Sequence, residues 1–199
     1  MLEVTNVSFR YASESPWLFK DLNLSVAPGE IVGLQGPSGQ GKTTLARLIG
    51  GYLTPSTGSI TVGGMSLPAE GFSRVQLLFQ HPELAVDPRW KIRRILTEGH
   101  HPSRVQMDAF DIQDDWLDRY PCEMSGGQLA RICLVRALGP DVEYIIADEI
   151  TSMLDALTQA RIWRSLIDYS EQNRIGILVI SHDSALLKRL CQRRVRLAA

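Results

Sequence analysis

The stretch GPSGQGKTT, residues 36–44, follows the apolar run EIVGLQ and leads directly into LARLIG. It fits the pattern G-x-x-x-x-G-K-[ST], which connects a buried strand to a helix through a glycine-rich loop. Gly36, Gly39 and Gly41 allow the backbone to curl until several N–H groups face one anion. The helix that follows adds its positive end. The stretch therefore predicts a phosphate-binding loop within an α/β fold.

Lys42 and Thr43 give this loop its expected chemistry. Lys42 is placed to reach the β- and γ-phosphates of a nucleotide, and Thr43 to put its hydroxyl on Mg²⁺. The alternative is an ordinary glycine-rich turn with a solvated lysine. The position between an expected strand and an expected helix favours the phosphate loop.

The rest of the chain alternates short apolar strands with helices. Strands are expected in residues 2–9, 18–26, 31–35, 75–79, 142–149 and 175–181, and residues 54–64 are expected to form a turn followed by another strand. Helices are expected in residues 43–53, 125–138, 155–172 and 184–193. Residues 81–124 lack strand runs and are expected to form a mostly helical insertion. This alternation indicates a parallel sheet covered by helices on both faces, with right-handed crossovers.

Composition excludes several classes of protein. The 199 residues are 44% hydrophobic, enough for one core, and 21 Lys and Arg against 22 Asp and Glu leave a net charge of -1. That balance lacks the positive charge of a nucleic-acid-binding protein, so no nucleic acid partner is expected. No apolar run approaches the roughly 20 residues of a membrane span, and the start has no signal pattern, so we expect a cytosolic chain. Cys122, Cys133 and Cys191 form no C-x-x-C pair and are expected to be reduced and mostly buried.

Two acidic residues end the apolar run YIIADE. Ligands of a parallel sheet bind beyond the carboxyl ends of its strands, so Asp148 is placed to hold Mg²⁺. Glu149 is then placed to orient an attacking water and take its proton. The alternative is a solvated acidic turn.

The stretch MSGGQ, residues 124–128, opens a predicted helix. Helix N-capping alone would explain Ser125. Two glycines in the first turn destabilise a helix, so we expect that a ligand approaches the backbone closely there, and the ligand that fits a helix N-terminus is an anion. Here the chain resembles the ATP-binding cassette (ABC) ATPases, whose signature is usually LSGGQ. The resemblance spans essentially the whole sequence, with the motifs in the family's order.

The resemblance implies a single ABC ATPase domain over residues 1–199. Its fold class is α/β, with a P-loop NTPase (RecA-like) parallel-sheet core and an antiparallel β subdomain. A small helical subdomain, about residues 81–124, is inserted between the Q-loop and the SGGQ signature.

The same resemblance assigns roles to single residues. It makes Tyr11 the aromatic that stacks on adenine, Gln80 the residue that touches Mg²⁺ and senses a membrane subunit, and His182 a γ-phosphate contact. Without it, Tyr11 is also explained as an edge-strand tyrosine, Gln80 as a solvated strand end and His182 as an ordinary histidine. The expected catalytic residues are Lys42, Gln80, Glu149 and His182, and the expected Mg²⁺ ligands are Thr43, Gln80 and Asp148. The expected nucleotide-binding residues are Tyr11, Gly36, Pro37, Ser38, Gly39, Gln40, Gly41, Lys42, Thr43, Thr44, Ser125, Gly126, Gly127, Gln128 and Asp155.

Three positions depart from the family pattern. Met124 replaces leucine, Met153 replaces a small residue, and Ile150 stands where a proline usually follows the glutamate. None of them removes a ligand. Ile150 does remove a backbone restraint beside Glu149, which affects how that carboxylate is positioned.

The function that the resemblance implies is MgATP hydrolysis by a dimer, in which each ATP lies between one phosphate loop and the SGGQ stretch of the second ATPase subunit. The cassette then drives separate integral-membrane permease subunits from the inner face of the cell membrane. The stretches FQHPELAVDPRW, RYPCEMSGGQ and SMLDALTQARIW resemble the peptide and nickel importer branch, so peptide, nickel or metal-chelate cargo and an external substrate-binding protein are expected. We expect a different, homologous second subunit rather than a homodimer.

Other functions stay open at this point. They are a non-transport ABC ATPase in DNA repair or translation, an export-type subunit, and a nucleotide-binding module that does not hydrolyse. The insertion at residues 81–124 is too short for a coiled-coil type, and the complete set of Lys42, Asp148, Glu149 and His182 disfavours a module without turnover.

Overall fold

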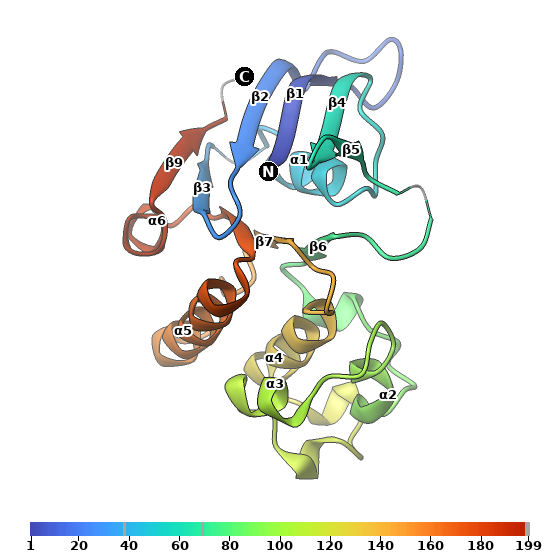
Figure 1. Ribbon diagram of the computed structural model, residues 1–199, viewed down its shortest axis with the longest axis vertical. Helices are drawn as coiled ribbons and strands as arrows, with labels where there is room; N and C mark the ends of the chain where they lie inside the picture. Colours follow the sequence, from blue (N-terminus) through green and yellow to red (C-terminus); the bar gives the residue numbers. More distant parts are fainter. Residues whose placement is uncertain (38, 69, 198–199) are drawn as a thin grey trace. The chain divides into compact units, whose positions relative to one another are not determined.

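The computed structural model describes residues 1–37, 39–68 and 70–197 (Figure 1). It forms two compact units. The first contains Met1–Leu77, Glu143–Asp148 and the part of the chain from Arg174 onward. The second contains Leu78–Val142 and Glu149–Asn173.

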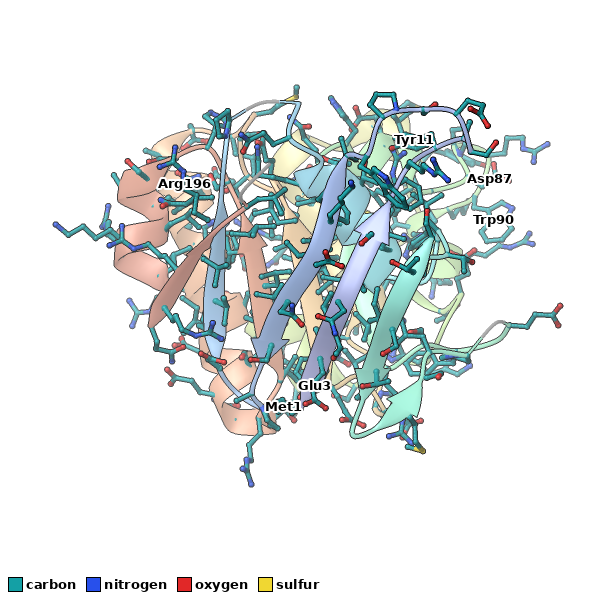
Figure 2. The ribbon with its side chains drawn as sticks, turned by 90° about the horizontal axis from the view of Figure 1, so that it is seen from above. Met1, Glu3, Tyr11, Asp87, Trp90 and Arg196 are labelled. Atoms are coloured by element: carbon teal, nitrogen blue, oxygen red, sulfur yellow. The ribbon has the colours of Figure 1, made fainter. Side chains whose placement is uncertain are left out.

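An antiparallel sheet makes up one part of the first unit. Its strands are β1 (Leu2–Phe9), β2 (Phe19–Val26), β4 (Thr57–Val62) and β5 (Met65–Ser66), in the order β2-β1-β4-β5. The buried side chains of β1 change phase between Val4 and Val7, where the register with β2 shifts. Asn6 has φ 50° at this irregularity, a left-handed conformation that asparagine tolerates better than most residues. Met1 and Tyr11 lie near opposite ends of this strand (Figure 2).

A five-stranded sheet forms the core of the first unit. Its strands are β3 (Ile31–Gln35), β6 (Val75–Leu78), β7 (Tyr144–Asp148), β8 (Gly176–Ile180) and β9 (Arg193–Arg196), in the order β6-β7-β8-β3-β9. The pairs β7–β8, β8–β3 and β3–β9 are parallel. Strands β7 and β8 are buried along their whole length, as expected for strands covered on both faces.

Two helices of the first unit pack on this sheet. Helix α1 (Lys42–Ile49) contacts β7, and α6 (Ser184–Leu190) contacts β3. Helix α1 ends where the sequence places two glycines, and Gly51 adopts a left-handed conformation with φ 79°. The parallel core with an antiparallel β subdomain therefore matches the predicted fold class.

The second unit is built from helices. They are α2 (Ile92–Leu96), α3 (Arg104–Ala109), α4 (Gly126–Ala137) and α5 (Ala156–Asn173), with the 3₁₀ turns η1 (Pro82–Leu84), η2 (Asp114–Trp116) and η3 (Pro121–Glu123). Helix α4 is buried on more than one side, since Ile132, Cys133, Leu134 and Val135 are all buried in succession. Within the described ranges, no helix has the length and apolar character needed to cross a bilayer.

One expectation about local structure is wrong. The helix expected over residues 184–193 ends at Leu190, and the chain continues as β9, which the sequence analysis missed. The backbone N–H of Gln192 donates to the carbonyl of Ile31 (3.0 Å), which aligns the next residues with β3. The stretch RRVR has no apolar alternation of its own, so it forms a strand because it pairs with β3, which is distant in the sequence.

The cysteines also differ from expectation, because only one of the three is buried. Cys133 is buried, Cys191 is half-buried and Cys122 is exposed, and all three are free thiols. Burial raises the pKa of the Cys133 thiol to about 11, so this thiol stays protonated at neutral pH.

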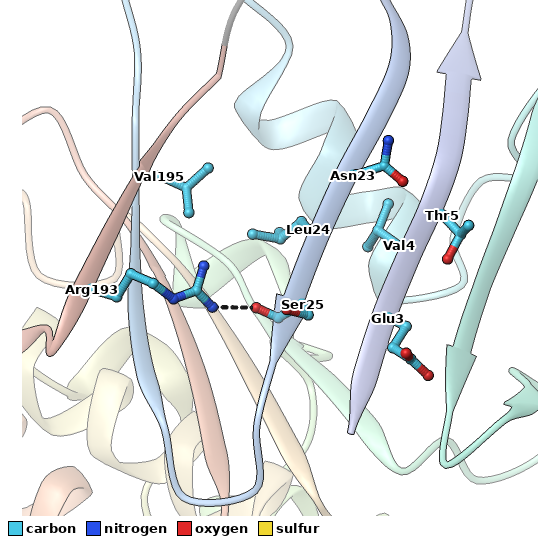
Figure 3. A pocket seen from close by; sticks show the side chains of 8 residues that line it. All are labelled: Glu3, Val4, Thr5, Asn23, Leu24, Ser25, Arg193 and Val195. Carbon is cyan, nitrogen blue, oxygen red and sulfur yellow. Dashed lines mark hydrogen bonds between the residues drawn. The ribbon is translucent and has the colours of Figure 1, made fainter.

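Strand β9 also completes the wall of a polar cavity of about 300 Å³ (Figure 3). Its lining residues are Glu3, Val4, Thr5, Asn23, Leu24, Ser25, Arg193 and Val195. Arg193 donates to the carbonyl of Ser25 (2.7 Å) and to the carboxylate of Glu30 (3.0 Å). The hydrogen bond from Arg193 lowers the pKa of Glu30. Arg193 thus ties β9 to the segment that joins the two sheets.

We expect Gly176→Ala to lower the free energy of unfolding by about 1–3 kcal/mol, the usual cost of overpacking a core. A Cβ on Gly176 would lie 2.6 Å from Cδ1 of Tyr144 and 2.8 Å from the carbonyl oxygen of Ala27. Gly99→Ala is the control, because its nearest neighbour would be a backbone oxygen 3.8 Å away. Urea unfolding compares the two variants. An equal change in both would contradict the close packing of β8 against β7.

Candidate functional site

The parallel register gathers three predicted site elements at one edge of the core sheet. Leu34 of β3 and Asp148 of β7 both pair with Ile180 of β8. The glycine loop follows β3, Asp148 ends β7, and His182 follows β8 by two residues. Because neighbouring strands lie about 4.8 Å apart, the backbones at the ends of β3 and β7 are about 10 Å apart across β8. The structure therefore brings the loop, Asp148 and His182 together in the first unit.

The loop itself depends on two of its glycines. Gly39 and Gly41 have φ 82° and 89°, which side chains rarely adopt. A Cβ on Gly41 would also lie 2.7 Å from Leu18. At Gly36 a Cβ would come too close only to the flexible end of Gln40, at 2.8 Å, and would make ordinary contacts with Leu197 at 3.5 and 3.6 Å. Ser38, a predicted nucleotide contact, lies outside the described residues.

Lys42 is not the solvated lysine of an ordinary turn. Its side chain bends back under the loop, and Nζ donates to the carbonyls of Gly36 and Pro37, both at 2.8 Å. The residue is only 8% exposed. Among the described residues, both hydrogen-bond acceptors of the ammonium are neutral carbonyls, and such a site favours an anion nearby.

The start of α1 is arranged for an anion as well. Gly41 occupies the N-cap, and among the described residues no side chain caps the helix and no acidic residue stands in its first turn. The first N–H groups and the positive end of the helix therefore remain available to a phosphate. Thr43 is exposed at this position, whereas Thr44 is 7% exposed and faces the protein.

Tyr11 is attached to this helix by its hydroxyl. The Tyr11 oxygen lies 2.7 Å from Oγ1 of Thr44, where either atom can donate. Its ring meets the edge of Phe9 at 5.0 Å between centroids, yet the residue is 65% exposed. An exposed aromatic ring is thus held in a fixed place next to the phosphate loop.

The two acidic residues after YIIA differ sharply. Asp148 is buried at the end of β7, with 6% exposure. Glu149 has φ 52°, a left-handed conformation that is uncommon for a residue with a side chain. A turn follows, in which the N–H of Ser152 donates to the carbonyl of Glu149 (3.1 Å), and Ile150 is buried. The alternative of a solvated acidic turn does not describe Asp148.

Gln80 contacts the segment that follows Glu149. Its Nε2 donates to Oγ of Ser152 at 3.3 Å, within the second unit. A strand end that is merely solvated would lack such a partner. The predicted sensor glutamine is therefore connected to the chain three residues beyond the predicted base.

Ser125 and Gln128 form a capping box at the start of α4. Ser125 Oγ accepts from the N–H of Gln128 (3.3 Å), and Gln128 Oε1 accepts from the N–H of Ser125 (2.9 Å). Local helix capping thus accounts for both side chains in this structure. It does not account for the two glycines between them.

The two glycines have different reasons. A Cβ on Gly127 would lie 2.6 Å from Cγ2 of Thr158, so close packing of α4 on α5 requires that glycine. A Cβ on Gly126 would make only an ordinary contact with Leu154, at 3.6 Å. Packing therefore leaves Gly126 unexplained.

A cavity of about 350 Å³ lies beside Gly126, within the second unit. Its walls come from η2, the start of α4, the segment before α5 and α5 itself: Trp116, Ser125, Gly126, Gly127, Gln128, Arg131, Met153, Leu154, Asp155 and Thr158. Asp155 caps α5 by accepting from the N–H groups of Leu157 and Thr158, both at 3.0 Å. Hydrogen bonds from Thr158 lower the pKa of Asp155, so its carboxylate is charged at neutral pH.

The described residues contain no cluster of three or more His, Cys, Asp or Glu side chains able to hold a metal. Mg²⁺ does not need one, because it usually takes one or two carboxylates, waters and the phosphates of its substrate. Thr43 and Asp148 supply hard oxygen ligands of that kind. The residues present at this edge therefore fit Mg²⁺.

Thr151, Gln159 and Trp163 belong to no motif in the sequence, yet they form a hydrogen-bonded cluster close to the predicted base in the chain. Thr151 is 3% exposed, and its Oγ1 accepts hydrogen bonds from both other side chains. The spacing of Gln159 and Trp163 predicts a shared helix face, but no pattern in the sequence points from that face to Thr151.

Comparisons with known proteins agree with this geometry. The ABC transporter family model matches residues 19–152. The chain is 36% identical to the nickel import ATP-binding protein NikE of Shigella boydii serotype 4 and 35% identical to NikE of Escherichia coli K12, in each case over 97% of this chain and 82% of the relative. The solved structure of MJ0796, a bacterial ABC transporter cassette, has a TM-score of 0.81 at 23% identity and covers 98% of this chain and 94% of that chain. The last comparison confirms the predicted fold.

We expect Gly127→Ala to lower the melting temperature and Gly126→Ala to leave it unchanged or slightly raised. Alanine fits a helix better than glycine, so only the contact with Thr158 opposes it. Thr158→Ser removes Cγ2 and should restore the stability of Gly127→Ala while keeping the hydroxyl. Thermal unfolding of the three variants checks this. A double variant as unstable as Gly127→Ala would contradict the role assigned to Thr158.

Proposed function

Since the chain belongs to the ABC transporter family, we propose that it is the ATP-hydrolysing subunit of an importer for nickel or a related cargo, acting on separate permease subunits. Members of this family bind ATP, and the chain is an ABC ATPase. The single observation that carries the proposal is the shared edge of β3, β7 and β8, where a buried lysine, a phosphate loop and a buried aspartate meet.

The first unit binds the nucleotide in this proposal. Backbone N–H groups of the loop, the start of α1 and Lys42 hold the β- and γ-phosphates. Lys42 needs only to leave the two carbonyls that it now contacts. Tyr11 stacks on adenine, which its exposed and anchored ring supports.

Thr43 and Asp148 hold Mg²⁺ in the proposed site, with Gln80 as a further ligand. The ion, when bound, neutralises charge on the β- and γ-phosphates. The position of Asp148 at the end of β7, level with Leu34 of β3, supports this assignment, because Mg²⁺ is usually held by one or two carboxylates together with the phosphates of its substrate.

Glu149 acts as the general base. Its carboxylate orients a water and takes its proton as that water attacks the γ-phosphate. His182, at the exposed end of β8, contacts the γ-phosphate. The left-handed backbone of Glu149 supports a special role, because such conformations persist where surrounding structure holds them.

A second ATPase subunit completes the site. The cavity beside Gly126 receives the γ-phosphate of a nucleotide bound by that subunit, with Ser125 and Gln128 leaving their capping box to contact it. Met153 lies in the segment before α5, lines this cavity and is 69% exposed. A large exposed side chain here suits one matched partner, so we favour a heterodimer of homologous subunits.

The cargo proposal depends on the NikE relatives, whose names describe nickel import. Peptides and metal chelates are the alternatives within the same branch. The cassette then works at the inner face of the cell membrane, with an external binding protein delivering cargo to the permease. Deleting the chain's gene and measuring uptake of radioactive nickel tests this. Unchanged nickel uptake together with lost peptide uptake would move the cargo to peptides.

Glu149→Gln should abolish steady-state hydrolysis and keep ATP binding. The amide has the same shape but cannot accept the proton of the water. Phosphate release and nucleotide titration measure the two properties. Hydrolysis within about tenfold of the parent would show that another group is the base.

Lys42→Ala and Ser125→Arg should separate the two halves of the site. Lys42 acts on nucleotide bound by its own chain, so its loss should weaken binding to the isolated subunit. Ser125 acts on nucleotide of the second subunit, so Ser125→Arg should leave that binding intact and block ATP-driven association. Titration and sedimentation distinguish them. Equal loss of monomer affinity in both variants is the result that contradicts the shared site.

A further inference from the structure

The segment of residues 149–155 joins the last residue of β7 to the start of α5. It begins with Glu149 in a left-handed conformation, which is unfavourable for a residue with a side chain and persists only where neighbours hold it. The next residue is Ile150, which leaves its φ free to vary, as a proline there would not. Contacts of the folded protein must therefore fix this segment.

Thr151 provides two of these contacts. Its Oγ1 accepts from Nε2 of Gln159 at 2.8 Å and from Nε1 of Trp163 at 3.0 Å. One hydroxyl oxygen can accept two hydrogen bonds, so both donors are satisfied by the same atom. Thr151 and Trp163 are each 3% exposed, which excludes water as a substitute. The two donors stand one turn apart on α5.

Helix α5 is a firm anchor for that pair of bonds. It has eighteen residues, and Ile162, Trp163 and Leu166 are buried along one face. Near its other end the ring of Tyr169 lies 5.6 Å from the ring of Phe110, between centroids. The hydrogen bonds from α5 to Thr151 therefore restrain the backbone of the segment against a well-packed helix.

The neighbours of Thr151 connect the same segment to other predicted site residues. Ser152 accepts from Gln80, and Leu154 donates its N–H to the carbonyl of Thr151 (3.1 Å). Leu154 and Asp155 then line the cavity beside Gly126. Thr151 thus stands at the centre of a segment whose two ends carry the predicted base and part of the predicted second phosphate site.

We propose that Thr151 is a positioning residue for hydrolysis: by binding Gln159 and Trp163 it fixes the backbone that carries the Glu149 carboxylate, replacing the restraint that Ile150 lacks. This rests on the proposed role of Glu149 as base. It goes beyond that role, because it assigns the placement of the carboxylate to a side-chain bond with α5. A displacement of about 1 Å at a reacting group can lower a rate about 100-fold.

The central test is Thr151→Val in the full chain, assayed for ATP hydrolysis in complex with its permease. Valine keeps the shape and removes the acceptor. We expect kcat to fall about 10- to 100-fold while KM for ATP and the Kd for nucleotide stay within about twofold. Thr151→Ser keeps the hydroxyl and should restore kcat to within about threefold of the parent.

Two further variants separate positioning from folding. Thr151→Val leaves the buried indole N–H of Trp163 without its acceptor, which by itself lowers stability. Adding Trp163→Phe removes that donor, so the double variant no longer buries an unpaired N–H, and it should keep the low kcat. Gln106→Leu is the control, because it breaks a buried hydrogen bond to the carbonyl of Leu138 (2.6 Å) elsewhere in the second unit. It should lower the melting temperature and leave kcat unchanged.

Several outcomes overturn the proposal. One is a parental kcat in Thr151→Val, another is a kcat that recovers together with stability in the double variant, and a third is an equal kcat loss in Gln106→Leu. Glu149→Gln is assayed in parallel. If Glu149→Gln hydrolyses normally, the proposed base is wrong and the positioning proposal falls with it. If Glu149→Gln is inactive and Thr151→Val is not, only the positioning proposal fails.

Discussion

The parallel pairing of β8 with both β3 and β7 is the constraint on which the site depends. It sets Leu34, Ile180 and Asp148 level with one another, so that three separate stretches of sequence end at the same edge. The phosphate loop gains a buried carboxylate beside it only because these strands are in register. A slip of one residue would turn the Asp148 side chain to the other face of the sheet.

Charge burial at this edge has a chemical consequence. Lys42 and Asp148 are both buried, and each is a strongly hydrated group in the unfolded chain. Among the described residues, the hydrogen bonds of Lys42 Nζ go to two neutral carbonyls, and Asp148 lies at the end of β7. A buried ammonium with neutral acceptors favours a ligand that carries negative phosphates, and the members of the ABC ATPase family bind ATP.

The four residues of the SGGQ motif in the second unit have different structural roles. In SGGQ, Ser125 and Gln128 cap α4, Gly127 makes room for Thr158, and Gly126 has no packing reason. Three of the four residues are thus explained by the helix and its neighbour alone. Gly126, which lines a cavity, is the residue of this motif that packing does not explain.

The sequence by itself determined the phosphate loop, the acidic pair, the signature stretch and the alternation of strands and helices, because these are written in local spacing and period. It did not determine that RRVR forms β9, that the Tyr11 hydroxyl hydrogen-bonds to Thr44, or that position 127 must be glycine to leave room for Thr158. It also gave no sign of the bonds from α5 to Thr151. Each of these joins residues whose proximity arises only when sheets and helices pack. Local patterns fix most of the elements, and packing decides the last strand and which side chains meet.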